Sequence, residues 1–121
     1  MRHLKHGRKL GRVRNQRKAL FKTLLGSLIM REKITTTEAK AKEAKSKIDK
    51  LINKAKKSAS GSAKINAIRE LVRILPENAA KKLGGDFLKK FSGRNSGYAR
   101  VIKLDRRKSD GARMAVIEFV D

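Results

Sequence analysis

Residues 33–57 read KITTTEAKAKEAKSKIDKLINKAKK. The first part, Lys33–Thr37, is short, rich in Thr and led by Ile34, which predicts an edge strand. From about Glu38 to Lys57 the apolar residues recur every three or four positions, which predicts a helix with one buried face. That face is formed by Ala41, Ala44, Ile48, Leu51, Ile52 and Ala55. The segment therefore supplies a strand and an amphipathic helix with almost no residues between them.

The helical pattern continues on both sides of this segment. Residues from about Arg14 to Arg31 are predicted to form a helix with a core face and a cationic face. After a linker at residues 58–62, a third amphipathic helix is predicted to end at Pro76, and a fourth, short helix follows through Leu83. The apolar stripes of the first and third helices are formed by Leu20, Leu24, Leu25, Leu28 and Ile29, and by Ile65, Ile68, Leu71, Val72 and Leu75.

The C-terminal third changes from a helical to an extended pattern. Tyr98–Leu104 and Met114–Val120 are rich in β-branched and apolar residues, which predicts two strands. The loop between them contains the turn signal Asp110-Gly111. Together with Lys33–Thr37 these strands predict an α+β fold in which amphipathic helices pack on a small three-stranded sheet.

The N-terminal residues 1–12 are predicted to form a basic extended arm ahead of a single α+β domain at residues 13–121. No acidic residue precedes Glu32, and Gly7 and Gly11 interrupt a segment that has few apolar side chains. Such a segment cannot bury enough apolar surface to fold alone, so we expect it to become ordered on a polyanion. The alternative is a tail that only increases solubility.

The charge of the chain indicates the class of its partner. Lys and Arg number 33 against 11 acidic residues, and the formal net charge is +22. A compact chain of this charge repels itself unless a polyanion neutralises it, and RNA, DNA and an anionic membrane surface are the three candidates. A DNA-compacting protein would more often carry a repeat. A membrane-active protein would need helices with an exposed apolar face.

The sequence offers little for chemistry. It has no Cys, and its only two histidines, His3 and His6, lie in the arm without a third ligand, so we expect no metal site. The carboxylates form no recognisable catalytic spacing, and no glycine-rich loop is present that would hold the phosphates of a cofactor. No apolar run approaches the length of about 18 residues that a membrane span needs. We therefore expect neither an enzyme nor a cofactor, small-molecule substrate or membrane partner.

The segment Ser92–Arg100, SGRNSGYAR, is the most specific candidate for an RNA contact outside the arm. Its small residues let the backbone approach a phosphate closely, and Arg94 and Arg100 can each bind a phosphate with two hydrogen bonds. Tyr98 can stack on an unpaired base, whereas the alternative interpretation makes Tyr98 a core residue. Arg106 and Arg107 add cations in the loop between the last two strands.

Several segments, taken in order, resemble a known family, the bacterial-type large-subunit ribosomal proteins called L-seventeen. The resemblance covers nearly the whole chain. The segments that carry it are Met1–Arg12 (MRHLKHGRKLGR), Arg17–Leu20 (RKAL), Ser27–Ile29 (SLI), Ile34–Glu43 (ITTTEAKAKE), Arg94–Lys103 (RNSGYARVIK) and Met114–Glu118 (MAVIE). The chain departs from the family pattern at Gln16, Ser96, Ala99 and Arg113, where His, Gly, Thr and Pro are common.

This resemblance implies a structural role on large-subunit ribosomal RNA near the polypeptide exit tunnel, with neighbouring large-subunit proteins as further partners. It implies a location in the cytoplasmic ribosome of a bacterium, and an organellar ribosome remains an alternative. The side chains that we predict to bind RNA share a cationic or stacking group in the arm, the first two helices or the C-terminal loops. They are Arg2, His3, Lys5, Arg8, Lys9, Arg12, Arg17, Lys18, Lys22, Lys40, Arg94, Tyr98, Arg100, Arg106 and Arg107.

Overall fold

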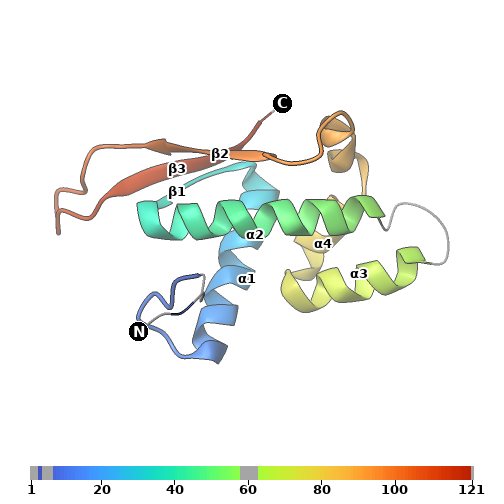
Figure 1. The fold of residues 1–121 in the computed structure, drawn as a ribbon, viewed down its shortest axis with the longest axis horizontal. Coiled ribbons are helices and arrows are strands. Elements are labelled where there is room, and N and C mark those ends of the chain that lie inside the picture. Colours follow the sequence, from blue (N-terminus) through green and yellow to red (C-terminus); the bar gives the residue numbers. More distant parts are fainter. Residues whose placement is uncertain (1–2, 4–6, 58–62, 121) are drawn as a thin grey trace.

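The computed structural model describes residues 3, 7–57 and 63–120, and its four α-helices lie on one side of a three-stranded sheet (Figure 1). The predicted linker at residues 58–62 and the arm residues Arg2 and Lys5 lie outside the described residues. Along the chain the elements are α1 (Arg14–Arg31), β1 (Lys33–Thr37), α2 (Glu38–Lys57), α3 (Ala63–Ile74), α4 (Glu77–Leu83), the 3-10 helix η1 (Asp86–Phe91), β2 (Ala99–Lys103) and β3 (Met114–Phe119). The α+β fold that the sequence predicts is confirmed.

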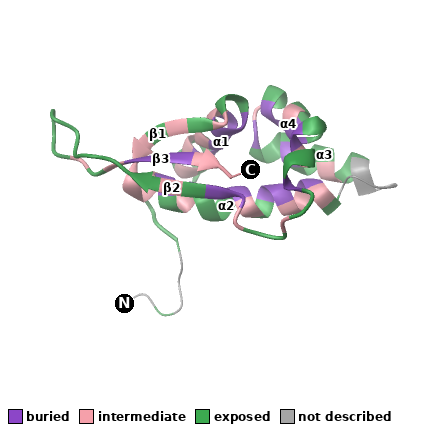
Figure 2. Cartoon of the chain, turned by 90° about the horizontal axis from the view of Figure 1, so that it is seen from above, coloured by how far each residue is buried: buried purple, intermediate pink, exposed green. Residues whose placement is uncertain are grey.

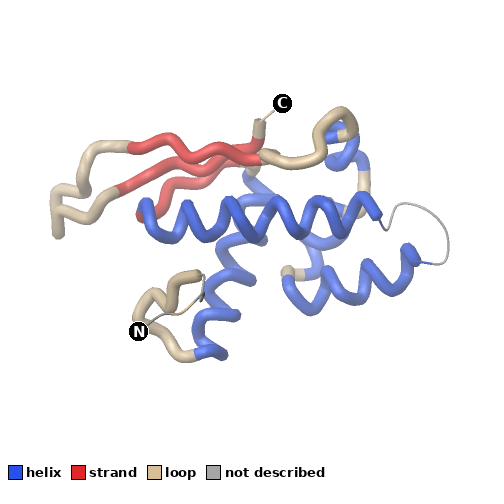
Figure 3. The backbone as a smooth tube through the Cα atoms, viewed as in Figure 1, coloured by secondary structure: helices blue, strands red, loops and turns tan. Residues whose placement is uncertain are grey.

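The sheet is antiparallel with the strand order β1-β3-β2. The last strand therefore lies at the centre, where Ile117 pairs with Ile34 of β1 on one side and with Val101 of β2 on the other. The prediction that Lys33–Thr37 forms an edge strand is confirmed. Helix α2 runs beneath the sheet, and no helix of the described chain covers the opposite face (Figures 1 and 3).

The core lies between α2, the inner face of the sheet and α1. Every residue that the sequence assigned to the buried face of α2 is buried, because local periodicity alone determines which side of a helix is apolar. In α1 the prediction is only partly correct. Leu25, Leu28 and Ile29 are buried, but Leu20 and Leu24 are half-buried, and Phe21 and Gly26 take the remaining core positions.

Helix α3 departs from its predicted burial. Leu71 and Leu75 are buried, whereas Ile65 is 60% exposed and Ile68 and Val72 are also exposed. Much of the α3 ribbon is therefore green, the colour of exposed residues, in Figure 2. Only one side of α3 packs against α2 and α4, and the remaining apolar side chains therefore lie outside the core.

Helix α1 packs very closely against the start of α4. A Cβ atom added to Gly26 would lie 2.7 Å from both Cδ and Cγ of Pro76. Helix α1 then ends at Glu32, which adopts the left-handed conformation with φ of 65° and donates its backbone N–H to the carbonyl of Leu28. The residue pair Gly26 and Pro76 therefore sets the distance between α1 and the segment that joins α3 to α4.

Candidate RNA interface

Several acidic side chains on the sheet, the helices and the C-terminal loop neutralise nearby cations. Glu118 on β3 accepts a hydrogen bond from Nε of Arg100 at 2.7 Å, and Nη2 of Arg100 lies 2.7 Å and Nζ of Lys33 3.7 Å from its carboxylate. These contacts lower the pKa of Glu118. Glu32 contacts Lys90 at 3.0 Å and Lys82 at 3.6 Å, and the hydrogen bond from Lys90 is the main reason that its pKa is lowered.

Two more carboxylates hold cations at the far end of the sheet. Glu38 lies 2.8 Å from Lys42 and 3.8 Å from Lys103, and the hydrogen bond from Lys42 lowers its pKa. In the loop between β2 and β3, Arg107 donates two hydrogen bonds to Asp110, at 2.9 and 2.7 Å, which lowers the pKa of Asp110 to about 2. Arg107, which was predicted to bind RNA, is therefore paired with a carboxylate of its own loop.

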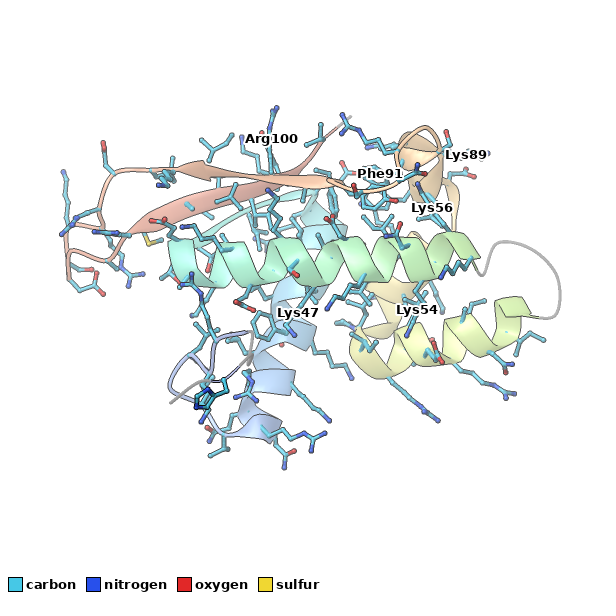
Figure 4. The ribbon with its side chains drawn as sticks, in the orientation of Figure 1. Lys47, Lys54, Lys56, Lys89, Phe91 and Arg100 are labelled. Carbon is cyan, nitrogen blue, oxygen red and sulfur yellow. The ribbon has the colours of Figure 1, made fainter. Side chains whose placement is uncertain are left out.

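A groove on the other side of the molecule has the opposite character. It lies between α1, α2 and α3 and has a volume of about 690 Å³. All of the polar side chains that line it are cationic. Helix α1 supplies Arg14, Arg17, Lys18 and Lys22, α2 supplies Lys47, Lys50 and Lys54, and α3 supplies Arg73. Figure 4 shows Lys47 and Lys54 on the side of α2 that faces away from the sheet. We call this feature the α1–α2–α3 groove.

Few groups within the molecule neutralise the groove. Nζ of Lys54 lies 2.9 Å from Glu70, Nζ of Lys47 lies 4.7 Å from the ring centroid of Phe21, and Arg17 donates to the backbone carbonyl of Arg12 at 3.3 Å. The other groove cations, Arg14, Lys18, Lys22, Lys50 and Arg73, form no ion pair with any described residue. A hollow lined by positive charges concentrates the positive electrostatic potential and attracts anions.

The Ser92–Arg100 segment, in contrast, is held against α2. The carboxylate of Asp49 accepts hydrogen bonds from the backbone N–H of Gly97 at 3.4 Å and of Tyr98 at 3.1 Å. Nζ of Lys56 donates to the backbone carbonyls of Phe91 and Arg94 and to the hydroxyl of Tyr98. Figure 4 shows Lys56 and Phe91 between α2 and this turn. Three polar contacts from one lysine fix the turn to the C-terminal half of the helix.

The prediction that Tyr98 stacks on RNA is wrong, because its side chain is 0% exposed. The ring packs edge-on against Phe91 with the centroids 5.3 Å apart, and the hydroxyl donates to Asn53 of α2. Tyr98 is therefore a core residue, which is the alternative interpretation of the sequence. Its polar end is satisfied inside the protein, so burial of the ring leaves no hydrogen-bonding group without a partner.

Both arginines of this segment also have partners within the chain. Nη1 of Arg94 donates to the carbonyl of Gly97 at 3.5 Å, and its side chain is half-buried. Arg100 pairs with Glu118, as described above, and projects from the uncovered side of the sheet (Figure 4). A phosphate would have to compete with these contacts. That Arg94 and Arg100 bind RNA stays a prediction.

The described part of the arm contacts the domain. Leu10, with φ of 54°, packs against the hydrophobic core, Arg12 donates to the carbonyl of Leu10 at 2.7 Å, and Arg8 lies 3.6 Å from Glu43 of α2. Residues 7–12 therefore fold back on the domain in part, which the sequence pattern did not predict. His3 and Lys9 are exposed, as are Lys18, Lys22 and Arg106, while Arg17 and Lys40 are half-buried.

Of the predicted RNA-binding residues that the structure describes, three lie in the groove, namely Arg17, Lys18 and Lys22. The groove is completed by five further cations that the sequence analysis did not place among the predicted RNA-binding residues, namely Arg14, Lys47, Lys50, Lys54 and Arg73. One signal was available, because Lys47, Lys50 and Lys54 follow each other at intervals of three and four residues and so lie on one face of α2.

The described residues hold neither a cluster of metal ligands nor a membrane-spanning helix. Within residues 3, 7–57 and 63–120, no group of three or more His, Cys, Asp or Glu side chains is arranged to hold a metal ion. In the described helices, no stretch combines the length and apolar character that crossing a membrane requires.

Comparison with known proteins gives one consistent result. Residues 20–120 match the family model described as "Ribosomal protein L17". The whole chain is 46% identical to the "Large ribosomal subunit protein bL17" of Chloroherpeton thalassium, over 69% of that protein. It is 44% identical to the protein of the same name from Staphylococcus haemolyticus, over 94% of this chain and 98% of the relative. The corresponding protein of Thermodesulfovibrio yellowstonii is 46% identical over the whole chain and 88% of its own length.

Proposed function

This chain belongs to the ribosomal protein L17 family, and we propose that within the large ribosomal subunit it binds ribosomal RNA through the α1–α2–α3 groove. Its role in the ribosome is structural and not enzymatic. The bacterial relatives are ribosomal, so the chain works in the cytoplasm as part of the ribosome, with ribosomal RNA and other ribosomal proteins as partners. A position near the polypeptide exit tunnel is a further part of the proposal, and its support is the family resemblance.

The observation that carries RNA binding is the separation of charge within the molecule. Carboxylates accompany the cations of the sheet and short helices, whereas five groove cations, including Lys18, Lys50 and Arg73, form no ion pair with described residues. Lys and Arg that lack an internal counter-charge gain most when they neutralise phosphates and release the counterions of RNA. The groove is therefore the surface where RNA binding is most favourable.

The proposal can be tested with the full-length protein and a large-subunit ribosomal RNA fragment in a filter-binding assay. We expect the triple variant Lys18→Ala, Lys50→Ala, Arg73→Ala to weaken binding and to lower the slope of log affinity against log salt by roughly 0.7–0.9 for each phosphate contact that is lost. Circular dichroism should show an unchanged fold, because all three side chains are exposed.

The matched control is the triple variant Lys33→Ala, Lys81→Ala, Lys89→Ala, which removes the same charge from cations that pair with Glu118, Glu77 and Asp86. We expect this variant to change affinity and salt slope much less. Equal losses in the two variants would show that total charge, and not the groove, determines binding. Sedimentation of a tagged chain with the 50S-type large subunit in a sucrose gradient would test the ribosomal location in cells.

A further inference from the structure

The α1–α2–α3 groove has a second property besides its charge. Each lining residue that is not cationic is apolar: Ala19, Phe21, Leu25, Leu51 and Ile74. Phe21, Leu25 and Leu51 are buried at the base of the groove, whereas Ala19 is exposed and Ile74 is 39% exposed. The hollow thus has an apolar floor that reaches solvent and a rim made of lysine and arginine.

The rim has two rows of charge on different helices. On α1, Arg14, Lys18 and Lys22 follow each other at intervals of four residues, which places successive side chains about 6 Å apart along the helix axis. On α2, Lys47, Lys50 and Lys54 repeat at similar intervals on the face that lines the groove. Such spacing is comparable to the separation of neighbouring phosphates along a nucleic-acid strand. A row of this spacing can bind successive phosphates of one strand, and the two rows together place cations from two helices around the apolar floor.

We propose that the groove receives one unpaired nucleotide of RNA, with its base on the apolar floor and its flanking phosphates on the two cationic rows. This inference rests on the proposed function and adds to it the structural class of the RNA. A continuous duplex presents phosphates, sugars and base edges but keeps the faces of its bases stacked, so it would contact the rim and leave the floor around Ile74 exposed to water. A base that is turned out of the helix provides the flat, weakly solvated surface that the floor requires.

The composition of the groove also determines how selective it is. Among the described residues that line it, none is acidic and none is a neutral polar side chain that could read the edge of a base. Recognition by apolar contact and phosphate binding tolerates any base, because every base has an apolar face. The groove should therefore distinguish an unpaired nucleotide from a paired one, and should distinguish poorly between the four bases.

A hairpin RNA with one bulged 2-aminopurine tests this inference with the full-length protein. The control RNA has the same sequence with the 2-aminopurine paired. We expect the bulged RNA to bind about tenfold more tightly, in the lower part of the range measured for contacts between single bases and side chains. We also expect the fluorescence of the bulged 2-aminopurine to rise on binding, because the base leaves its neighbours in the RNA stack.

The variant Ala19→Leu adds bulk to the floor without a change of charge, and Ala19 is exposed on α1, so the fold should tolerate it. We expect it to abolish both the preference for the bulge and the fluorescence rise, while binding of the paired hairpin persists. Gln16→Leu is the matched control, since Gln16 is exposed on the same helix and does not line the groove.

Three results would overturn the inference, and they differ in what else they exclude. Equal affinity of the wild-type protein for the bulged and paired hairpins would exclude a nucleotide site but leave RNA binding through the rim intact. Failure to bind either hairpin at low salt would exclude the proposed function as well. A preference for the bulge that survives in Ala19→Leu would show that the nucleotide is bound elsewhere.

Discussion

The α1–α2–α3 groove and the turn at residues 92–100 both have cations beside them, yet the cations at the two places have different partners. In the turn, Lys56 donates to two backbone carbonyls and a hydroxyl, and Arg100 pairs with Glu118. In the groove, Lys18 and Lys50 form no ion pair with the described residues. The same residue type therefore stabilises the fold at one place and remains available for an external anion at the other.

The difference comes from the acceptors that surround each cation. A lysine beside free backbone carbonyls or a carboxylate is satisfied within the chain, as Lys56 is by Phe91 and Arg94. A lysine whose described neighbours are mainly other cations and apolar side chains has no carboxylate to pair with among them, as at Lys18 and Lys50 in the groove. A high charge in the sequence consequently identifies a polyanion-binding protein but not its binding surface.

The largest expected effect is a loss of stability when the core packing of the turn at residues 92–100 is removed. Tyr98→Ala removes a fully buried ring that packs against Phe91 and a hydroxyl that bonds to Asn53. We expect the free energy of unfolding to fall by about 3–5 kcal/mol, as for other large-to-small changes in a core. Urea unfolding measures this loss. If Tyr98 instead stacked on RNA, the variant would lose RNA affinity with little change in stability.

The next effect tests whether helix packing forms the groove. Gly26→Ala would place a methyl group 2.7 Å from Pro76, so α1 must move away from the segment between α3 and α4. We expect a loss of about 1–3 kcal/mol, typical of overpacking, although alanine favours the helix more than glycine does. Thermal unfolding would detect it. Increased stability would mean that the helix propensity outweighs the contact and that Pro76 can shift without cost.

A smaller effect is expected when the counter-charge of Lys54 is removed, because Lys54 then resembles the groove cations that form no ion pair with the described residues. Glu70 lies 2.9 Å from Lys54 and offsets its charge. We expect Glu70→Gln to strengthen RNA binding by a few fold and to steepen the salt dependence by less than roughly 0.9 in slope, the value for one full phosphate contact. Filter binding at several salt concentrations provides the measurement. The same substitution at Glu77, which pairs with Lys81 on α4, is the control and should leave affinity nearly unchanged.

The smallest expected effect concerns the contribution of one ion pair on the sheet to stability at acidic pH. Arg100 lowers the pKa of Glu118 in the folded chain, so the pair stabilises the fold at pH values above the ordinary pKa of Glu, about 4.3. As pH falls below that value and through the folded pKa, protonation removes this contribution and the melting temperature should decline. Glu118→Gln should show a shallower decline over the same range. Identical pH profiles would indicate that the pair adds nothing, as is common for exposed ion pairs.

Local sequence patterns were sufficient to predict the four α-helices, the three strands and the buried face of α2. The bounds of the first two helices and of the first strand agree with the structure, because the change from period two to period 3.6 and the position of apolar residues depend on neighbours in the sequence. The same reasoning failed at α3, where Ile65 and Ile68 have the spacing of a core stripe but are exposed. Periodicity identifies an apolar side but does not say whether another element covers it.

The segment after Gly85 shows a different failure. The sequence analysis predicted no element between the fourth helix and the strand at Tyr98, yet Asp86–Phe91 forms the 3-10 helix η1 and buries Phe87 and Phe91. A 3-10 helix of six residues is too short for the repeat of its apolar residues to distinguish it from a loop. Its existence depends on aromatic contacts with Tyr98 and Phe119, which lie later in the chain.

By itself the sequence determined the four α-helices and the three strands, the buried face of α2, the charge of +22 and, through its family resemblance, a place in the large ribosomal subunit. Only the tertiary structure decided that β3 lies at the centre of the sheet, that Tyr98 is buried and that cations from three helices meet in one groove. The reason is the range of the interactions. Periodicity and charge belong to neighbouring residues, whereas a groove or a satisfied hydroxyl requires groups that the fold brings together from distant parts of the chain.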